Sequence, residues 1–319
     1  MLLRRPLGAA LALVLMVGCT DDARSDGDEE PPSTDASTSS STSITITTVA
    51  PTTTTAPVDV HALRPPAAAG DPAALARQIA AAEAVLRTAD AGEADVATAA
   101  LAQQVAYRQL GDHPDWDAAV LGALPPALVP VAEAHVAARR DLRALTGEPA
   151  TEMPAWRIVP PEPAADLVAW YQEAEADFGV PWQYLAAINL VETATGRIRG
   201  TSVAGAQGPM QFMPATWATY GEGDINDPRD AIRGAARYLT ASGAPADMAG
   251  ALWSYNHSDR YVRAVQRYAD LIVEHPGAYA GFHGWGVWYW TTAGDIYLPV
   301  GWEATAPVAV DQYVATHPR

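Results

Sequence analysis

The sequence predicts a mainly α-helical fold, and three observations support this prediction. Apolar residues recur at helical spacing through most of the chain beyond about residue 71, for example Leu75, Ile79 and Leu86 in DPAALARQIAAAEAVLRTA. Aspartate-proline pairs and glycines, which commonly begin and end helices, flank these runs. Alternating aromatic residues typical of strands gather in one segment near the C-terminus. With 49% hydrophobic residues among 319, the chain can bury a sizeable core.

The first residues, MLLRRPLGAALALVLMVGC, have the layout of a secretory signal peptide, with arginines before an apolar run that is short for a membrane span. Cys19 is the only cysteine, so no intrachain disulfide is possible. Its position resembles a bacterial lipobox, in which the cysteine becomes the lipid-modified first residue. We expect a signal peptide at 1–19, lipidation at Cys19, and export to the cell envelope, anchored at the outer face of the cytoplasmic membrane. The alternative is an ordinary signal peptide with an incidental cysteine.

Residues 20–68 are predicted to form a disordered Ser/Thr/Pro-rich tether. The segment begins with DDARSDGDEE and continues with a Ser, Thr and Pro run that has almost nothing to bury. Together with a lipid at Cys19, it would let a folded domain work at a distance from the membrane. The formal net charge of -17 argues against nucleic acid and anionic lipid surfaces as partners, because both would repel the chain.

Residues 69–150 are predicted to form a helical N-terminal region. The run EADVATAALAQQVAYRQLG closes on Gly111, and further helical runs follow it. His113 and His135 have no metal-ligand partners at short spacing, so we expect structural or solvent roles for them and no metal site. The segment MPAWRIVPPEP, residues 153–163, is interpreted as a proline-punctuated connector.

The chain changes character after this connector. AADLVAWYQEAEADFG is predicted to be a helix that ends at Gly179, and VPWQYLAAINLVETATG a second helix that begins at Pro181. On the second helix, Leu185, Ile188 and Glu192 lie on one face. A carboxyl group therefore continues a stripe that should be buried.

The predicted position of Glu192 has a chemical consequence. Desolvation disfavours its anion, and so does the negative end of the helix dipole close to it, so both effects raise its pKa. A carboxylic acid that is still protonated near neutral pH can protonate a glycosidic oxygen as the sugar leaves. The alternative is a solvated glutamate at a frayed helix end.

Further motifs follow Glu192 in a particular order. They are GAQGPMQFMPATW, then DPRDAIRGAARYL, then AGALWSYN, which ends in Tyr255 and Asn256. Together they resemble the soluble lytic transglycosylases of bacterial cell walls, which share the goose-type lysozyme fold, over roughly residues 164–268. The resemblance implies a mainly α, lysozyme-like (goose-type) catalytic domain, which we place at residues 151–281, after an N-terminal helical extension.

The resemblance also implies roles for particular residues. Glu192 matches the family's single catalytic acid/base. Glycines would let the loop backbone approach a sugar closely, Met210 and Phe212 would offer apolar surface to sugar faces, and Gln211 would bond a hydroxyl or acetamido group. The residues expected to bind substrate are Thr193, Gln207, Gly208, Met210, Gln211, Phe212, Tyr255 and Asn256.

The sequence departs from the family pattern in two places. Thr193 stands where serine often follows the glutamate, and no glycine follows Asn256. We expect His257 to be solvated at a helix boundary and Ser258 to cap the next helix.

The number of carboxylates bears on the reaction. A typical glycosidase uses two catalytic carboxylates, but the resemblance implies a single one. It also implies that the enzyme cleaves the bond between N-acetylmuramic acid and N-acetylglucosamine in peptidoglycan glycan strands. The implied product carries a 1,6-anhydro ring, and no metal or organic cofactor is implied. Asp227 and Asp230 are explained as residues of a helix start.

Two alternatives remain open for the reaction. A goose-type lysozyme-like hydrolase would need a second carboxylate across the groove, for which Asp224 is the residue to check. A non-catalytic glycan-binding lipoprotein would keep the groove without a need for Glu192. We expect the protein to be a monomer.

Residues 282–319 are predicted to be an aromatic-rich C-terminal hairpin and tail. In GFHGWGVWYWTTAGDIYLPVGW, aromatic residues surround a TTAGD turn. Trp285, Trp288 and Trp290 are candidates for stacking on sugars. Trp288 and Trp290 share one strand face, however, and packing that closes the helical core is the preferred interpretation.

Overall fold

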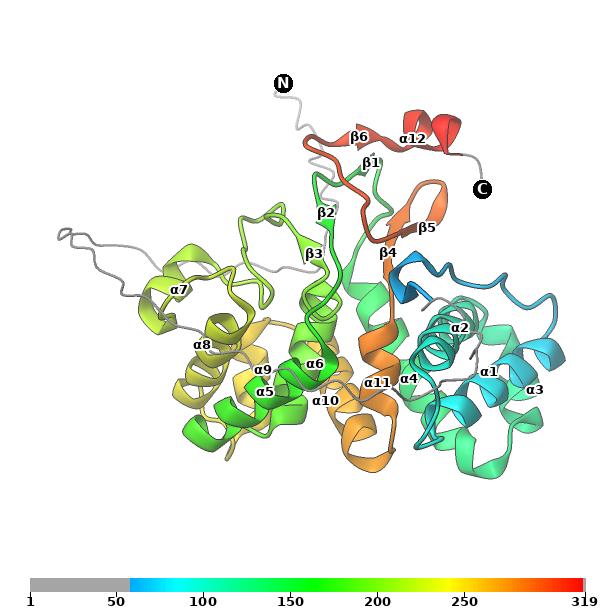
Figure 1. Ribbon diagram of the computed structural model, residues 1–319, viewed down its shortest axis with the longest axis horizontal. Coiled ribbons are helices and arrows are strands. Elements are labelled where there is room, and N and C mark those ends of the chain that lie inside the picture. Colours follow the sequence, from blue (N-terminus) through cyan, green and yellow to red (C-terminus); the bar gives the residue numbers. More distant parts are fainter. Residues whose placement is uncertain (1–57, 318–319) are drawn as a thin grey trace, which may run out of the picture. The chain divides into compact units, whose positions relative to one another are not determined.

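The computed structural model of the protein describes residues 58–317, which fold mainly into α-helices (Figure 1). The predicted mainly α fold is therefore confirmed. The predicted signal peptide with Cys19, and the predicted tether up to residue 57, lie outside the described residues. Within residues 58–317, no helix is both long enough and apolar enough to cross a membrane.

The N-terminal region is helical, as predicted. Asp71 caps its first long helix, because the Asp71 side chain accepts a hydrogen bond from the Ala74 amide at 2.7 Å. Leu75 and Ile79 of that helix are fully buried and pack in a small core with Leu110. The helices of this region are η1 (Val60–Ala62), α1 (Pro72–Leu86), α2 (Glu93–Asp112), η2 (Pro114–Trp116), α3 (Asp117–Ala123), η3 (Pro126–Leu128) and α4 (Val129–Leu145).

The larger core surrounds helix α6 (Trp182–Thr193). Leu185 and Ile188 are fully buried there, as their spacing predicted. Gly179 ends the preceding helix in a left-handed conformation with φ of 74°, also as predicted. The other helices around this core are α5 (Ala164–Phe178), α7 (Pro214–Tyr220), α8 (Pro228–Ala241), α9 (Met248–Tyr255), α10 (Asp259–Glu274) and α11 (Ala278–Gly284).

The predicted domain boundary at residue 150 does not interrupt the packing. The core around α6 includes Leu86 of α1, Ala100 of α2, and Val131 and Ala138 of α4. Helix α4 packs against α10, on the other side of that boundary. The N-terminal helices therefore brace the helices of the predicted catalytic domain.

Three pairs of short antiparallel strands complete the structure. The predicted connector 153–163 is more regular than expected, because it takes part in two of these pairs. Its strand partners lie far away in the sequence, so no local pattern indicated the pairing. The strands are β1 (Glu152–Met153) with β6 (Val308–Ala309), β2 (Arg157–Ile158) with β3 (Ile198–Arg199), and β4 (Val287–Thr291) with β5 (Gly294–Leu298), and α12 (Val310–Thr316) follows β6.

The predicted C-terminal hairpin is formed by β4 and β5, with Trp290 paired with Asp295. Its two faces differ from the expectation, because Val287 and Tyr289 are buried while Trp288 and Trp290 are only partly buried. The two tryptophan rings do not close the helical core. The guanidinium of Arg108 lies 4.9 Å from the Trp288 ring centre, and that of Arg143 lies 4.2 Å from the Trp290 ring centre.

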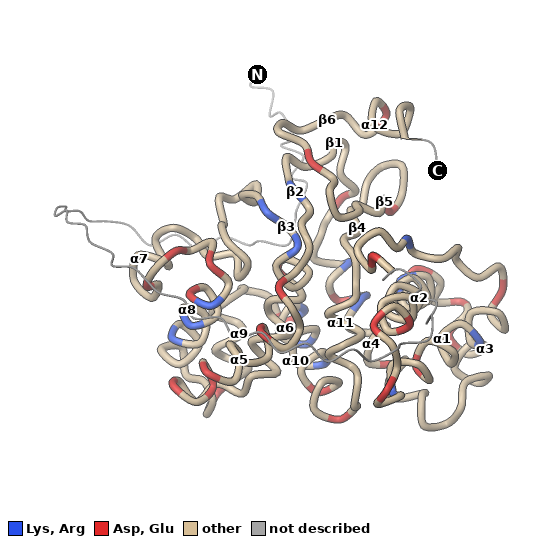
Figure 2. The backbone as a smooth tube through the Cα atoms, viewed as in Figure 1, with Lys and Arg blue, Asp and Glu red and all other residues tan. Residues whose placement is uncertain are grey.

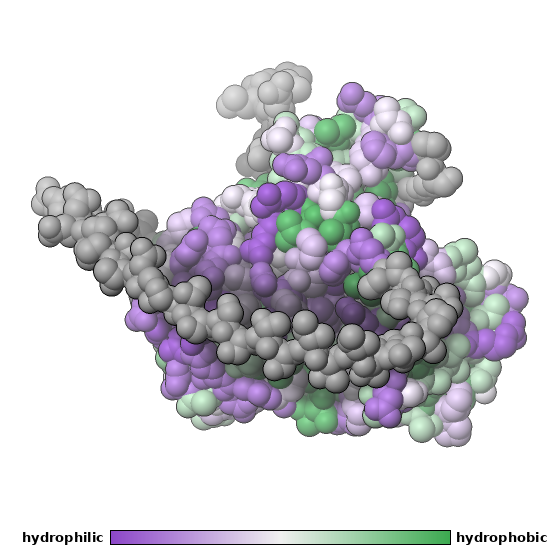
Figure 3. Space-filling model, viewed as in Figure 1, coloured by the Kyte–Doolittle hydropathy of each residue, from purple (hydrophilic) through white to green (hydrophobic). Residues whose placement is uncertain are grey.

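The surface that is visible in Figure 3 is hollowed in its middle, below the short strands. The visible residues in the hollow are mostly hydrophilic, whereas small apolar patches lie above it (Figure 3). In Figure 1, helix α6 lies near the centre of the same view, with β2 and β3 above it and β4 above it to the right. The end of α6 is therefore the place where helices and strands meet.

Candidate active site

Glu192 lies in the last turn of α6 and is partly buried. Burial raises the pKa of its carboxyl group to about 8, although a hydrogen bond from Tyr261 acts in the opposite direction. The predicted rise of the pKa is therefore confirmed. At neutral pH, Glu192 is a protonated acid with a proton to donate.

Tyr261 of α10 is the direct partner of Glu192. Its Oη donates a hydrogen bond to Oε1 of Glu192 at 2.7 Å. The Tyr261 side chain is fully buried, and burial together with the nearby Glu192 raises the pKa of the Tyr261 hydroxyl well above its usual value. Tyr261 therefore keeps its proton and acts as a donor. Sequence analysis did not single out this residue, because its spacing with Val265 and Tyr268 indicates only the buried face of a helix.

The glycine-rich loop is fastened to α6 through the carbonyl group of Pro209. Asn189 Nδ2 donates to this oxygen at 2.8 Å, and Thr193 Oγ1 donates to it at 2.6 Å. Tyr171 of α5 in turn donates to Asn189 Oδ1 at 2.6 Å. Thr193 is completely buried, so its hydroxyl holds the loop and is not open to a ligand. Asn189 was missed in the sequence, although it lies one helical turn before Thr193.

The loop itself is a tight hairpin. Gln207 and Phe212 exchange two backbone hydrogen bonds, both 2.9 Å long. Gly208 and Gln211 both adopt positive φ, 73° and 51°, and the Gln211 side chain donates to the Gly208 carbonyl at 2.9 Å. The Gln211 amide therefore stabilises its own loop in this structure.

Two loop residues do not fulfil the role predicted for them. Met210 is fully buried and Phe212 nearly so, and both belong to the core around α6. Their side chains therefore pack inside the protein and do not offer apolar surface to a sugar. Tyr255 Oη donates to the Met210 carbonyl at 2.7 Å, and the Tyr255 ring lies parallel to the Tyr261 ring, with 6.4 Å between centroids. Tyr255 thus connects the loop to the partner of Glu192.

Glu192 lines a cavity of about 160 Å³. The cavity adjoins a second one of about 190 Å³, because both are lined by Arg108, Arg139, Val191, Ile198 and Trp288. Of the residues predicted for catalysis or substrate binding by the family resemblance, only Glu192 lines the first cavity. Trp288 and Trp290, the candidates for stacking on sugars, line it together with Glu192. Asn256 is buried, and its Oδ1 has no hydrogen-bond partner within residues 58–317. The complete lining is Arg108, Arg139, Arg143, Thr146, Glu148, Ala150, Trp156, Val191, Glu192, Ile198, Trp288, Tyr289 and Trp290.

The other carboxylates have mostly structural roles. Asp227 caps α8, as predicted, since its side chain accepts from the Asp230 amide at 3.0 Å. Asp230 accepts from the Asp224 amide at 2.9 Å, and Asp224 accepts from the Asn226 amide at 2.8 Å. Asp224 does not line the cavity, whereas the exposed Glu148 does. In the described part of the chain, no group of three potential metal ligands gathers.

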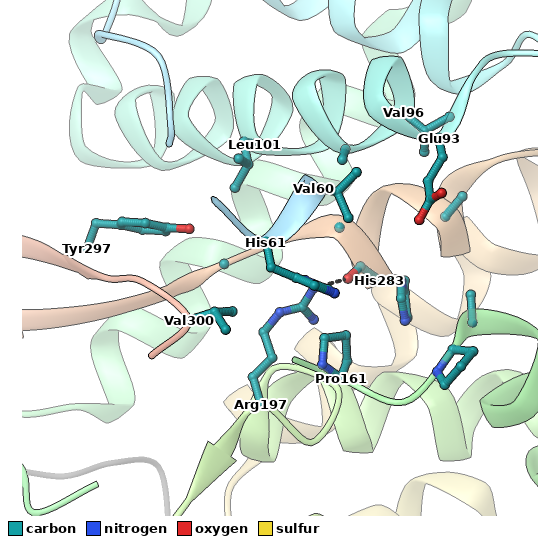
Figure 4. A pocket seen from close by; sticks show the side chains of 16 residues that line it. Val60, His61, Glu93, Val96, Leu101, Pro161, Arg197, His283, Tyr297 and Val300 are labelled. Atoms are coloured by element: carbon teal, nitrogen blue, oxygen red, sulfur yellow. Dashed lines mark hydrogen bonds between the residues drawn. The ribbon is translucent and has the colours of Figure 1, made fainter. Parts of the chain in front are cut away.

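Another cavity, of about 410 Å³, lies between η1, α2, α11 and β5 (Figure 4). None of the predicted site residues lines it. Its buried Arg197 donates to the carbonyl of Ala194, at the end of α6, and to the carbonyl of His283, near the end of α11. Arg197 therefore neutralises the negative ends of two helices, which explains its burial without a carboxylate partner.

Replacing Tyr261 with phenylalanine should change the pH dependence of any reaction that uses Glu192 as an acid. Loss of the hydrogen bond that lowers the pKa of Glu192 should move this pKa further upward. An acid catalyst is active below its pKa, so the alkaline fall of kcat/KM should shift to higher pH. The rate below the fall should drop by about tenfold, because the carboxyl group is no longer oriented.

Tyr255→Phe is the matched control for this substitution, since Tyr255 binds the Met210 carbonyl and not Glu192. The alkaline fall of kcat/KM in the Tyr255→Phe variant should stay at the wild-type pH. The same alkaline fall in wild type and Tyr261→Phe would contradict the assigned contact.

The site and the fold together define a class of protein. A partly buried, protonated glutamate at the end of a central helix, held by a tyrosine next to a glycine-rich hairpin, suits acid-catalysed glycosidic cleavage in a mainly α, lysozyme-like domain. The comparisons agree: residues 169–271 match the family model of the Transglycosylase SLT domain. This segment of the chain is therefore similar to the transglycosylase SLT domain.

One curated relative supports the same family. The chain is 31% identical over 128 residues to the membrane-bound lytic murein transglycosylase F of Thiobacillus denitrificans (strain ATCC 25259 / T1). The aligned segment covers 38% of this chain and 27% of the relative. The chain thus matches only about a quarter of that protein's length. No solved structure matches the chain.

Proposed function

We propose that the protein is a peptidoglycan lytic transglycosylase. Its substrate would be the β-1,4 bond between N-acetylmuramic acid and N-acetylglucosamine. The observation that carries the proposal is the protonated Glu192, bound by Tyr261 at 2.7 Å within the segment that matches the Transglycosylase SLT domain. The substrate class is supported by the family match and by the name of the curated relative.

The proposed reaction uses Glu192 twice. First, its carboxyl proton goes to the glycosidic oxygen, the bond from this oxygen to C1 of the muramoyl sugar breaks, and the acetamide of the same sugar stabilises the positive charge at C1. Next, the carboxylate of Glu192 takes the proton of the sugar's C6 hydroxyl, whose oxygen bonds to C1. The product carries a 1,6-anhydro ring, Glu192 is protonated again, and no water is consumed.

A lysozyme-like hydrolase is the second candidate function. The observation that favours it is the exposed carboxylate of Glu148, which lines the same cavity as Glu192. A second carboxylate would activate a water molecule on the other side of the sugar. In this case the product would have a reducing end, and Glu148→Gln would abolish its release.

Mass spectrometry of muropeptides released by the full chain distinguishes the candidates. We expect 1,6-anhydromuramoyl products and no incorporation of oxygen from labelled water. Reducing ends that carry the labelled oxygen would show a hydrolase. Binding of peptidoglycan without any product would identify a non-catalytic glycan-binding protein and end the enzyme proposal.

The proposal extends to location and organisation. A signal peptide at 1–19, a lipid on Cys19 and a tether at 20–68 would hold a catalytic domain, residues 151–281, close to the cell wall as a monomer. The name of the relative, a membrane-bound lytic murein transglycosylase, supports an envelope location. Fatty-acid labelling of the chain that persists in Cys19→Ser would rule out this lipid anchor.

A further inference from the structure

Three arginines line the cavity that contains Glu192. Arg108 comes from α2, and Arg139 and Arg143 come from α4. None of them lies in the segment 169–271 that matches the Transglycosylase SLT domain. In a chain with a net charge of -17, such a cluster beside the carboxyl group of Glu192 is unexpected. Figure 2 shows acidic positions spread over the helices and basic positions gathered in a few places, among them the region between α4 and β4.

Part of the cluster holds the C-terminal hairpin. Asp295 of β5 accepts hydrogen bonds from Arg108, from Arg139 at 3.2 Å and from Arg143 at 3.0 Å. Asp112, at the end of α2, lies 3.4 Å from Arg143 and 3.7 Å from Arg139. Two carboxylates therefore face three guanidinium groups, and neither Asp295 nor Asp112 lines the cavity.

The ion pairs leave donors of the cluster unused. Arg108 and Arg139 each bind Asp295 through one terminal nitrogen, and Arg139 Nε is buried without a hydrogen-bond partner in the described part of the chain. Burial, and to a lesser degree the neighbouring Arg139, lower the pKa of Arg108 to about 9 despite Asp295, so its cation is not fully stabilised by the carboxylates around it. The carboxyl groups of the lining are the exposed Glu148 and the protonated Glu192. A buried guanidinium that lacks a full set of acceptors favours an anion.

Attachment of the hairpin alone does not require this arrangement. One arginine pairs with one carboxylate in a bidentate manner, as Arg140 does with Asp117 through two bonds of 2.8 Å. At Asp295 three arginines converge, and each pays the desolvation of a partly buried cation. The surplus of positive charge over the two neighbouring carboxylates points to a ligand that supplies further negative charge.

We propose that Arg108, Arg139 and Arg143 bind a carboxylate carried by the glycan strand, beside the bond that Glu192 cleaves. This inference rests on the proposed function and names the substrate class more closely. A volume of about 160 Å³ is smaller than the usual 300–1,000 Å³ or so of small-molecule pockets, so it suits a charged side group and not a whole disaccharide. In peptidoglycan, this carboxylate belongs to the peptide stem or, where the stem is absent, to the lactyl group of the muramoyl sugar.

Binding measurements on the full chain test the inference. In a Glu192→Gln background, which stops turnover, calorimetry would compare three tetrasaccharides: stem-bearing peptidoglycan fragments, the same fragments with an amidase-freed lactyl carboxylate, and uncharged chitotetraose. Arg139→Gln should weaken binding of the stem-bearing fragment by about tenfold, as expected for a charge-assisted hydrogen bond. Binding of chitotetraose should change by less than about twofold, and Arg139→Lys should restore part of the loss.

The matched control is Arg140→Gln, on the same helix and paired with its own Asp117. It should leave the ratio of the binding constants for charged and uncharged fragments unchanged. Weaker binding of the stem-bearing fragment alone by Arg139→Gln would assign the stem carboxylate, and weaker binding of the amidase-treated fragment alone would assign the lactyl carboxylate. Weaker binding of both would show that the cluster accepts either carboxylate. Equal losses for all three ligands, or no loss for any, would overturn the inference and leave the three arginines with only the structural role of holding the hairpin.

The binding experiment is independent of catalysis. If the wild-type chain released no product from peptidoglycan, the proposed function would fail, yet the ratio of binding constants would still decide whether the arginine cluster recognises a carboxylate.

Discussion

Glu192→Gln is expected to reduce the rate of product release from peptidoglycan by about a thousandfold or more. General acid catalysis alone contributes about a hundredfold to ten-thousandfold, and the proposed reaction uses the same group as acid and then as base. Glutamine has nearly the same shape and can accept the hydrogen bond from Tyr261, but it has no proton to give. Muropeptide release measured against time, with equal amounts of folded protein, checks this expectation.

The control for this substitution is Glu222→Gln, which removes an exposed carboxylate paired with Arg237. Its activity should equal that of the wild type. A Glu192→Gln protein with more than about a tenth of wild-type activity would show that another group supplies the proton.

The stability of Glu192→Gln provides a second check. The folded-state pKa of Glu192, about 8, is above its ordinary value of 4.5, so folding favours the protonated form. This contribution to stability is complete below about pH 4.5 and is lost as the pH rises through about 8. The variant has no such loss. Relative to wild type, it should gain on the order of 2–4 kcal/mol in the free energy of unfolding between pH 5 and pH 9. Equal pH dependence of the two proteins would contradict a buried, protonated Glu192.

Gly208→Ala should destabilise the protein by about 3–5 kcal/mol, because two costs add at this position. Gly208 has a positive φ of 73°, and a Cβ atom there would lie 1.9 Å from the carbonyl oxygen of Ile225. Backbone cannot yield as a flexible side chain would, so the loop would have to shift. The Pro209 carbonyl that Asn189 and Thr193 hold would move with it. Urea unfolding monitored by circular dichroism measures the loss.

Gly205→Ala is the matched control in the same loop. Gly205 also has a positive φ, 95°, but an added Cβ atom would meet nothing within 4 Å. Only the backbone cost of about 1–2 kcal/mol should remain. If both variants lost the same stability, the close approach of Gly208 to Ile225 would not be the reason for this glycine.

Much of the helical architecture could be predicted from local patterns. Asp71 and Asp227 cap helices at the predicted places, Gly179 ends α5, and Ser258 caps α10 by accepting from the Arg260 amide at 3.2 Å. The capping contacts join residues only two or three positions apart. Such short-range interactions appear in the sequence without knowledge of the rest of the fold.

The candidate site could be predicted only in part. Glu192 was found because its helical face and its position near a helix end are local properties. Whether the other candidates are exposed is not a local property. Thr193, Met210 and Phe212 lie in the motifs that carry the family resemblance, but their side chains are buried. A motif indicates which residues gather at a site, whereas contact with a ligand depends on which atoms the surrounding helices leave uncovered.

The sequence by itself determined the helices, the C-terminal hairpin, and an acid on a buried helix face followed by a glycine-rich loop. These features depend on periodicity, capping and turn residues, which act over a few positions. Only the tertiary structure decided that Tyr261 holds Glu192, that Pro209 is fastened to α6, and that three arginines share its cavity. The physical reason is distance along the chain: α2, α4, α6, α10 and the hairpin meet only through packing, and no local pattern records which side chains then face one another.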